Sequence, residues 1–345
     1  MKHLPDLFPV VRSRVVPPVC VALGPPWPVT QLVAHIREAH PAGEVVCFQM
    51  DQFVGGRLRE KLAQENLEAE VVVGADLWDL PRKFRTVIFP AASFADRELK
   101  IDMVDQGYHI LEDGGLFITL SEYEKDTQFA KWQKRIYGKC GESPTDPAGM
   151  AFWSPRAGER PRRRHAITFH ARIGDCPGLA IETWPGTFSY GEMDQGSRAM
   201  LEVTALSAGE HVLDMGCGNG SVGCLASTLA ADVRVTFVDS NARATALTAR
   251  NVAANTVANT TIVTDPDLGG LTPSGYDVIL ANPPYYANSE VARLFIATAR
   301  DLLAPGGRFY LVTKMPVQTI PEVVETFGDV ESVDNRGYTV LTARV

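Results

Sequence analysis

The sequence lacks a long apolar run, because no stretch of its 345 residues approaches the ~20 consecutive apolar residues that span a bilayer. Its first residues, Met1 to Asp6, also contain no apolar core of a secretory signal peptide. Apolar residues make up 45% of the chain, a fraction typical of soluble globular proteins. We therefore expect a cytoplasmic protein that has no leader and no membrane partner.

The chain also lacks the cysteine spacing of a metal site or a redox motif. Its six cysteines, at positions 20, 47, 140, 176, 217 and 224, form no C-x-x-C pair. We expect free thiols in a reducing compartment and no bound metal. His165 and His170 have a spacing that a metal could use, but they lie on an alternating pattern that indicates a β-strand, so we expect no ligand role.

Positive charge is scarce overall, with 33 Lys and Arg against 41 Asp and Glu, and it is unevenly distributed. Residues 173–345 hold 10 basic residues against 19 acidic ones, whereas residues 125–172 hold 11 basic residues against 4 acidic ones. Clustered Lys and Arg are what nucleic-acid phosphates require, so this region, including Arg162, Arg163 and Arg164, is the expected phosphate-binding surface. The alternative is a solvated, flexible linker that happens to be basic.

The length of the chain suits two domains of ordinary size. Strands alternate with helix-length segments in both halves, which indicates parallel sheets. Four prolines interrupt the segment between the halves: Pro144, Pro147, Pro155 and Pro161. We expect a first domain over residues 1–140, a basic, proline-rich linker over 141–164 and a second domain over 165–345.

The two halves resemble each other strand by strand. The matching segments are Val46 to Asp51 with Val235 to Asp239, Thr86 to Pro90 with Asp277 to Ala281, and Glu112 to Thr119 with Ala304 to Leu311. We therefore expect a duplicated α/β domain, with a doubly wound, mostly parallel sheet in each half.

A glycine-rich turn, Asp214 to Gly220, follows an apolar strand in the second half. Glycines let the backbone adopt positive φ and approach a ligand closely, and a helix expected from Ser221 would offer free N–H groups. The pattern fits dinucleotide sites equally well. The first half has Leu23 to Trp27 at this place, with two prolines and a tryptophan, so its copy should bind no nucleoside cofactor.

Acidic residues end the next two strands of the second half. Asp239 follows Arg234 to Val238, at the position where a carboxylate would accept hydrogen bonds from ribose hydroxyls. Asp265 follows the strand Thr260 to Val263, where it would meet an adenine edge. Either acid alone could be a helix cap, but both together, in this order, predict a nucleoside cofactor.

The loop Asn282-Pro283-Pro284-Tyr285 directly follows the apolar strand Asp277 to Ala281. The carboxyl ends of parallel strands are where ligands bind in open α/β sheets. The Asn282 side-chain oxygen and the Pro283 carbonyl could accept both N–H bonds of a planar amine, while Tyr285 stacks on its ring. The nitrogen lone pair would then face an electrophile, which predicts methylation of a planar NH2 group. The first half has Ala91-Ala92-Ser93-Phe94 here and should not catalyse.

The order of these motifs resembles that of class I S-adenosylmethionine-dependent methyltransferases. The segments Pro185 to Ser189 and Met193 to Ser197 are similar to those of ribosomal RNA guanine-N2 methyltransferases of the RsmC/RlmG type. The resemblance spans nearly the whole chain, because that family also carries a degenerate copy followed by an active one. It implies two tandem Rossmann-like methyltransferase domains and S-adenosyl-L-methionine as the cofactor.

The resemblance also implies roles for individual residues. The implied cofactor-binding residues are Asp194, Gly196, Ser197, Asp214, Gly216, Gly218, Asp239 and Asp265. The first three would border the methionine end, the next three the centre, and the last two the ribose and the adenine. The residues implied to hold the target base are Asn282, Pro283 and Tyr285, with Pro284 and Tyr286 beside them.

The target base stays open at this point. Guanine-specific members usually continue Asn-Pro-Pro-Phe-His, whereas this chain has Tyr285 and Tyr286. Asn-Pro-Pro-Tyr is also typical of enzymes that methylate the adenine amine or a glutamine side-chain amide. We expect guanine N2 of small-subunit ribosomal RNA, with an adenine amine, a protein glutamine and a non-enzymatic ribosome-assembly role as alternatives. The expected partner is ribosomal RNA or a ribosomal subunit, and the duplication favours a monomer.

Overall fold

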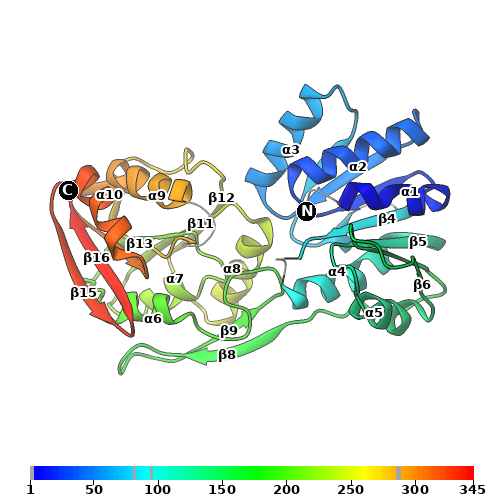
Figure 1. The fold of residues 1–345 in the computed structure, drawn as a ribbon. Helices are drawn as coiled ribbons and strands as arrows, with labels where there is room; N and C mark the ends of the chain where they lie inside the picture. Colours follow the sequence, from blue (N-terminus) through cyan, green and yellow to red (C-terminus); the bar gives the residue numbers. More distant parts are fainter. Residues whose placement is uncertain (1–3, 81–82, 94–95, 285–288) are drawn as a thin grey trace. The chain divides into compact units, whose positions relative to one another are not determined.

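The computed structural model describes residues 4–80, 83–93, 96–284 and 289–345. The chain divides into two compact units, Met1–His165 and Ala166–Val345, each built on its own sheet (Figure 1). No helix within these described ranges has the length and the apolar composition to cross a membrane.

The first unit is built on a sheet of seven strands: β1 (Val19–Ala22), β2 (Val45–Gln49), β3 (Glu70–Val73), β4 (Phe84–Ala91), β5 (Leu111–Ser121), β6 (Gly141–Glu142) and β7 (Met150–Pro155). Their order in the sheet is β3-β2-β1-β4-β5-β7-β6. The first five are mutually parallel, and β7 runs antiparallel to both of its neighbours.

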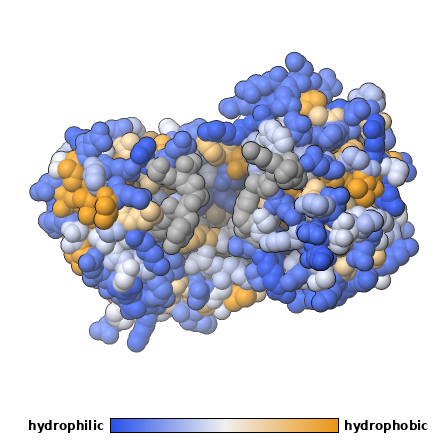
Figure 2. Space-filling view, viewed as in Figure 1, coloured by the Kyte–Doolittle hydropathy of each residue, from blue (hydrophilic) through white to orange (hydrophobic). Residues whose placement is uncertain are grey.

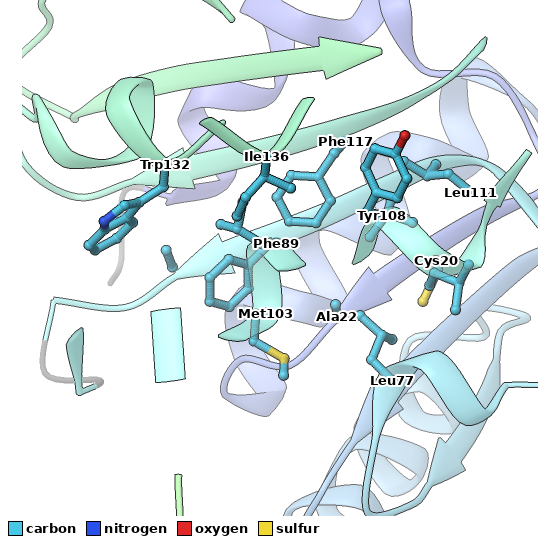
Figure 3. Packing of buried hydrophobic residues seen from close by; sticks show 14 of the residues in the cluster. Cys20, Ala22, Leu77, Phe89, Met103, Tyr108, Leu111, Phe117, Trp132 and Ile136 are labelled. Atoms are coloured by element: carbon cyan, nitrogen blue, oxygen red, sulfur yellow. The ribbon is translucent and has the colours of Figure 1, made fainter. Parts of the chain in front are cut away.

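Helices cover both faces of this sheet: η1 (Leu4–Leu7), α1 (Phe8–Val11), η2 (Arg12–Arg14), α2 (Pro26–Ala39), α3 (Gln52–Gln64), η3 (Leu77–Asp79), α4 (Arg97–Ile110) and α5 (Gln128–Tyr137). Successive strand residues face opposite sides of a sheet, so Val19 and Val21 pack into one core cluster with residues of α2 and α3. Cys20 packs into the other cluster, with residues of α4 and α5 such as Met103 and Trp132 (Figure 3).

The predicted linker over residues 141–164 is wrong for its first part, because β6 and β7 are strands of the first sheet. β7 pairs with β5 from Leu116 opposite Pro155 to Ser121 opposite Met150. The prolines lie at the borders of these strands and do not break them, since Pro155 ends β7 and Pro144 lies in the connection between β6 and β7. The boundary between the two compact units in the sequence lies after His165.

The sheet of the second unit also has seven strands: β10 (His211–Met215), β11 (Arg234–Asp239), β12 (Thr260–Thr264), β13 (Tyr276–Ala281), β14 (Leu303–Thr313), β15 (Val330–Asn335) and β16 (Tyr338–Arg344). Their order, β12-β11-β10-β13-β14-β16-β15, repeats that of the first sheet. A separate antiparallel pair, β8 (Ile167–Ala171) and β9 (Leu179–Thr183), precedes it in the chain.

The helices of the second unit are α6 (Gln195–Val203), α7 (Ser221–Ala226), α8 (Ala242–Ala254), α9 (Ser289–Leu302) and α10 (Pro316–Phe327). Val212 packs into a core cluster with residues of α6 and α7, whereas its neighbour Leu213 packs with residues of α9 and α10. Two mostly parallel sheets with helices on both faces and one shared strand order confirm the predicted tandem Rossmann-like fold.

Candidate active site

A pocket of the second unit lies at the carboxyl ends of β10 and β13. Three segments contribute to it: the stretch that leads into α6, the glycine-rich turn after β10, and the first residue after β13. The lining residues are Phe188, Ser189, Asp194, Ser197, Met200, Asp214, Gly216, Cys217, Asn219, Ser221, Val222 and Asn282. The structure therefore brings together five of the residues predicted for the site, namely Asp194, Ser197, Asp214, Gly216 and Asn282.

The glycine-rich turn depends on its glycines. Gly216, Gly218 and Gly220 have φ values of 74°, 55° and 74°, which side chains other than glycine rarely adopt. A Cβ atom at Gly220 would come within 2.8 Å of the Thr248 side chain. The turn lies against β11, since the N–H groups of Gly216 and Cys217 both donate to the Val238 carbonyl over 2.9 Å.

Asp239 joins the end of β11 to this turn. Its Oδ2 accepts a hydrogen bond from the Gly218 N–H over 2.9 Å, and its Oδ1 accepts one from the Asn241 N–H over 2.9 Å. The carboxylate thus lies beside the turn, at the strand end where the sequence predicts a ribose-binding acid.

Asp214 is a buried carboxyl group at the end of β10. Its Oδ2 accepts from the Gly223 N–H over 2.8 Å. The pKa of Asp214 is raised to about 7, chiefly by burial. The Gly223 hydrogen bond lowers it in part, and the nearby charge of Asp239 adds to the increase. The Ser221 N–H donates to Asn219 Oδ1 over 3.0 Å. The expectation that the start of α7 offers free N–H groups is wrong for these two, because side chains already accept from them.

Asn282, directly after β13, has a defined carboxamide orientation. Its Nδ2 donates to Asp194 Oδ2 over 2.8 Å and to Ser197 Oγ over 2.9 Å. Asp194 Oδ2 also accepts the Ser197 N–H over 2.7 Å, as the N-cap of α6. An ionised carboxylate only accepts hydrogen bonds, so the amide nitrogen must face Asp194 and Oδ1 must lie on the opposite side.

The segment around α6 therefore does more than line the pocket. Asp194 and Ser197, which the resemblance implies for the cofactor, are hydrogen-bonded to Asn282. Gly196 does not line the pocket, and a Cβ atom there would come within 2.9 Å of the Tyr338 ring. A glycine at this position lets α6 pack closely on β16.

Asp265, Pro283 and Pro284 also lie outside the lining of this pocket. Asp265 accepts with Oδ1 from the Asp267 N–H over 3.0 Å and with Oδ2 from the Gly270 N–H over 2.8 Å. It thereby stabilises its own loop, and a contact with adenine stays a prediction. Pro283 is buried and Pro284 is exposed. Tyr285 and Tyr286 lie outside the described residues.

Phe188 and Ser189 also line the pocket. The sequence marks them only as part of the segment Pro185 to Ser189, which carries the family resemblance, and not as site residues. The Phe188 side chain is 58% exposed, and its Cβ lies 3.6 Å from the point where a Cβ on Gly218 would be. The Asn219 side chain donates to the Phe188 carbonyl over 3.4 Å. In the sequence Phe188 is only an aromatic residue of this segment. Its place in the site becomes clear when the structure shows the segment folded over the turn.

The turn is also held from α8 through Asn251. Its Nδ2 donates to the Asn219 carbonyl over 2.8 Å and to the Glu182 carbonyl over 2.9 Å. Its Oδ1 accepts from the Glu182 N–H over 2.9 Å. One buried side chain therefore connects the turn to β9.

The cysteines near the pocket are not suited to nucleophilic chemistry. Burial raises the pKa of Cys217 well above its usual range and that of Cys224 to about 12, and nearby carboxylates add to both shifts. Both thiols are therefore protonated at neutral pH. In the part of the chain that the structure describes, no three His, Cys, Asp or Glu side chains gather as metal ligands.

The arginines predicted to bind phosphate lie in residues 156–164 of the first unit. We name this segment the arginine strap. Arg162 forms an ion pair with Asp79 over 3.3 Å, and Arg164 forms one with the buried Asp76. Both guanidinium groups lie over the Trp78 ring, at 5.5 Å and 5.1 Å. Arg163 is exposed, and no ion pair involves it within the described residues.

The first unit also has a hollow, which lies at the amino ends of its parallel strands. It is lined by residues at the amino ends of β2 and β3, among them Val45 and Glu70, together with Arg37. Arg37 donates to the backbone carbonyls of Glu68 and Gly43. The hollow thus lies away from the strand ends at which α/β sheets bind ligands.

Comparison with known proteins relates the second unit to a family. Residues 178–342 match the family model of the methyltransferase small domain. The match lies within the second unit and covers most of it.

Three relatives illustrate the similarity of this chain to ribosomal RNA enzymes. Ribosomal RNA small subunit methyltransferase C of Chromohalobacter salexigens is 35% identical over 49% of this chain and 52% of its own length. The protein of that name from Pseudomonas aeruginosa is 27% identical over 67% of this chain and 71% of its own. Ribosomal RNA large subunit methyltransferase G of Streptomyces avermitilis is 28% identical over 47% and 44%. The chain spans about half the length of two of these three relatives.

A solved structure extends the likeness to both units. It is the T. thermophilus 16S rRNA N2 methyltransferase RsmC in complex with AdoMet and guanosine, with a TM-score of 0.77 and 20% identity. The match covers 99% of this chain and 91% of that one. The fold is therefore shared over its whole length, and the predicted resemblance to the RsmC/RlmG type is confirmed.

Proposed function

We propose that this chain transfers a methyl group from S-adenosyl-L-methionine to the N2 amine of a guanine in small-subunit ribosomal RNA. The observation that carries the proposal is Asn282, which Asp194 and Ser197 orient in the pocket that also contains the glycine-rich turn. The names of the relatives support the reaction and the class of RNA, and the RsmC complex with AdoMet and guanosine supports the base.

The residues around the turn fit a nucleoside cofactor with a methionine tail. Gly216 and Gly218 keep side chains out of the space next to the backbone, and a Cβ atom at Gly216 would come within 3.1 Å of the Phe295 ring. The Asp239 carboxylate beside the turn suits the two hydroxyls of a ribose. When bound, this cofactor supplies an electrophilic methyl group on a positively charged sulfonium.

The chain's own contribution to the chemistry is to position the amine. The lone pair of an exocyclic amine is delocalised into the ring, so the nitrogen needs its two N–H bonds held before it can react. In our proposal Asn282 Oδ1 and the Pro283 carbonyl accept these bonds, and Tyr285 stacks on the base. Positioning of this kind can supply most of the catalysis, and the protonated Cys217 takes no part. The extra proton of the methylated nitrogen leaves to solvent.

The first unit serves substrate recognition in this proposal, since its turn at Leu23 to Trp27 lacks the glycine pattern of the second unit. The partner is ribosomal RNA or a ribosomal subunit, and the place of action is the cytoplasm, where ribosomes are assembled. We propose a monomer, because one chain carries both copies of the domain; sedimentation analysis would test this.

Methyl transfer to a panel of substrates tests the proposal. Purified protein is incubated with methyl-labelled cofactor and with small ribosomal subunits, naked 16S rRNA, large subunits, DNA or a release factor. Mass spectrometry of nucleosides is expected to find N2-methylguanosine in 16S rRNA. Label on adenosine or on a glutamine would overturn the choice of acceptor. Absence of cofactor binding at millimolar concentration would overturn the enzymatic assignment itself.

A further inference from the structure

Ten of the eleven basic residues of positions 125–172 form two groups in the first unit, and the eleventh, Arg172, belongs to the second unit. The first is the arginine strap, in which Arg160 forms an ion pair with the buried Asp105 over 3.3 Å and Arg162 and Arg164 are paired as described above. Arg156 donates to the Leu111 carbonyl over 2.9 Å. The second group lies on or beside α5: Lys125, Lys131, Lys134, Arg135 and Lys139.

Helix α5 has one apolar face and one basic face. Phe129, Trp132 and Ile136 are buried, and Trp132 and Ile136 belong to the core cluster shown in Figure 3. The Phe129 and Trp132 rings meet edge to face with centroids 5.2 Å apart. The packing leaves one side of the helix for Lys131, Lys134 and Arg135, which are all exposed. Hydrophilic residues cover much of the face of the molecule drawn in Figure 2.

Little negative charge opposes this basic face. Within the described residues no ion pair involves Lys125, Lys131, Lys134, Arg135 or Lys139. Asp126 is buried and accepts the N–H groups of Gln128 and Phe129. Glu142 on β6 is an exposed acid whose charge, with that of Lys134, acts on the pKa of Cys140. The exposed Glu124 is adjacent to Lys125 in the chain, so Glu124 and Glu142 together offset the five cations only in part.

The stability of the helix does not account for this arrangement. Like charges three or four positions apart destabilise a helix by about 0.2–0.5 kcal/mol per pair, and Lys131 has Lys134 and Arg135 at those distances. The helix dipole favours Lys134 and Arg135 in the last turn, but it disfavours Lys125 before the first turn. A ligand with many negative charges would account for all five.

We propose that the basic face of α5, with Lys125 and Lys139, is a docking surface for the phosphate backbone of RNA. The identity of the polyanion rests on the proposed function. A helix of 10 residues is about 15 Å long, and a nucleic-acid duplex carries one phosphate per ~3.4 Å of axis on each strand. A face of this length spans roughly four phosphates of one strand. Lys131, Lys134 and Arg135 lie on it, and Lys125 and Lys139 lie just beyond its two ends. The arginine strap instead stabilises the first unit.

Two double variants with equal loss of charge test this surface. Lys131→Gln/Arg135→Gln removes two cations spaced i,i+4 on α5. Arg57→Gln/Lys61→Gln removes two cations with the same spacing on α3, where Lys61 pairs with Glu65 over 3.5 Å. The affinity of each protein for a 16S rRNA transcript is measured by filter binding over a series of salt concentrations.

The α5 variant is expected to bind more weakly and to lose about 1.4–1.8 from the slope of log K against log salt, since each phosphate contact contributes about 0.7–0.9. Its KM for rRNA should rise while kcat is retained, and the control variant should match the wild type. Equal slopes for the α5 variant and the wild type, or an equal loss in the control, would overturn the proposal.

The docking surface and the proposed reaction fail in different ways. A wild-type protein that methylates rRNA, together with an α5 variant that binds normally, leaves the reaction and removes the surface. A wild-type protein that binds the transcript through α5 but methylates no rRNA leaves the surface and removes the reaction. Circular dichroism of both double variants shows whether the helices are intact.

Discussion

At the residue scale, the function proposed for this chain depends on the direction of one carboxamide. Asn282 presents an oxygen to an amine only if its nitrogen is engaged elsewhere, and Asp194 and Ser197 engage it. Because Asp194 is held as the N-cap of α6, the orientation is established when the protein folds. No part of it has to be arranged when the substrate binds.

Substitution of Asn282 should therefore separate catalysis from cofactor binding. We expect Asn282→Ala to abolish methyl transfer and to leave the affinity for S-adenosyl-L-methionine, measured by calorimetry, largely intact. Asp194→Asn should have a smaller effect. It removes the charge from the hydrogen bond between Asp194 and Asn282, at a cost of about 1.5 kcal/mol. We expect kcat to fall about tenfold with little change in KM. An equal loss of cofactor affinity in both variants would mean that these residues bind the cofactor instead.

The buried Asp214 should make stability depend on pH. The unfolded chain ionises this group near its ordinary pKa, whereas the pKa of Asp214 in the folded protein is about 7. The folded state thus holds the proton more tightly, so its contribution to the free energy of unfolding falls as the pH rises from about 4 to about 7. Asp214→Asn, whose oxygen can still accept from the Gly223 N–H, should show a smaller decline. Urea denaturation at several pH values measures it, and parallel curves for both proteins would contradict the expectation.

Some site residues could be predicted from the sequence because strand ends determine where they lie. Asp239 and Asn282 each follow an apolar strand, and the carboxyl ends of parallel strands meet at one edge of a sheet. The pairing of Asp194 with Asn282 could not be predicted, because it joins residues 88 positions apart through side-chain geometry. The ion pairs of Arg162 with Asp79 and of Arg164 with Asp76 could not be predicted for the same reason. A role of these arginines in phosphate binding stays a prediction.

At the element scale, Asn251 of α8 and Asn255, the C-cap of that helix, hold the edge of β9. Asn255 accepts from the Ala180 N–H and donates to the Ala180 carbonyl, and Asn251 does the same at Glu182. Asn251 alone also donates to the Asn219 carbonyl in the glycine-rich turn. The two asparagines thus form hydrogen bonds with the backbone of β9 at Ala180 and Glu182, two residues apart, as a neighbouring strand would.

These asparagines form a matched pair for mutation. Either Asn→Ala change leaves buried backbone groups without partners and should lower the free energy of unfolding by about 1–3 kcal/mol. Only Asn251→Ala should also weaken cofactor binding, because only Asn251 holds the turn. Chemical denaturation and calorimetry of both variants check this, and equal cofactor affinities would show that the turn keeps its shape unaided.

The last two strands of the first sheet, β6 and β7, could not be predicted from the sequence. The prolines between residues 144 and 161 suggested an irregular linker, yet Met150 to Pro155 pairs along β5. Proline lacks an N–H group, but it is tolerated at a strand border, and Pro155 stands at the end of β7. β7 forms because β5 offers an edge with which it can pair. Because β5 is distant in the sequence, the residues around β7 carry no sign of this pairing.

At the scale of the whole molecule, two units with separate cores should unfold as separate cooperative steps. Cofactor at 100 times its Kd adds about 2.7 kcal/mol to the unit that binds it, which for a unit of this size raises the transition by roughly 5–10 °C. Arg164→Gln leaves Asp76 without its guanidinium and should lower the other transition. Differential scanning calorimetry is the measurement, and a single transition that responds to both changes would contradict the assignment of cofactor and strap to different units.

The repetition of one strand order within a single chain has a consequence for biogenesis. During synthesis the amino-terminal sheet emerges first and can fold before its counterpart is complete. Tandem domains of similar sequence tend to exchange strands and become trapped as misassembled species. Divergence between the copies, such as the prolines that replace glycines after β1, reduces the number of interchangeable segments. The divergence that in our proposal leaves the leading copy without a cofactor would therefore also favour correct folding of the chain.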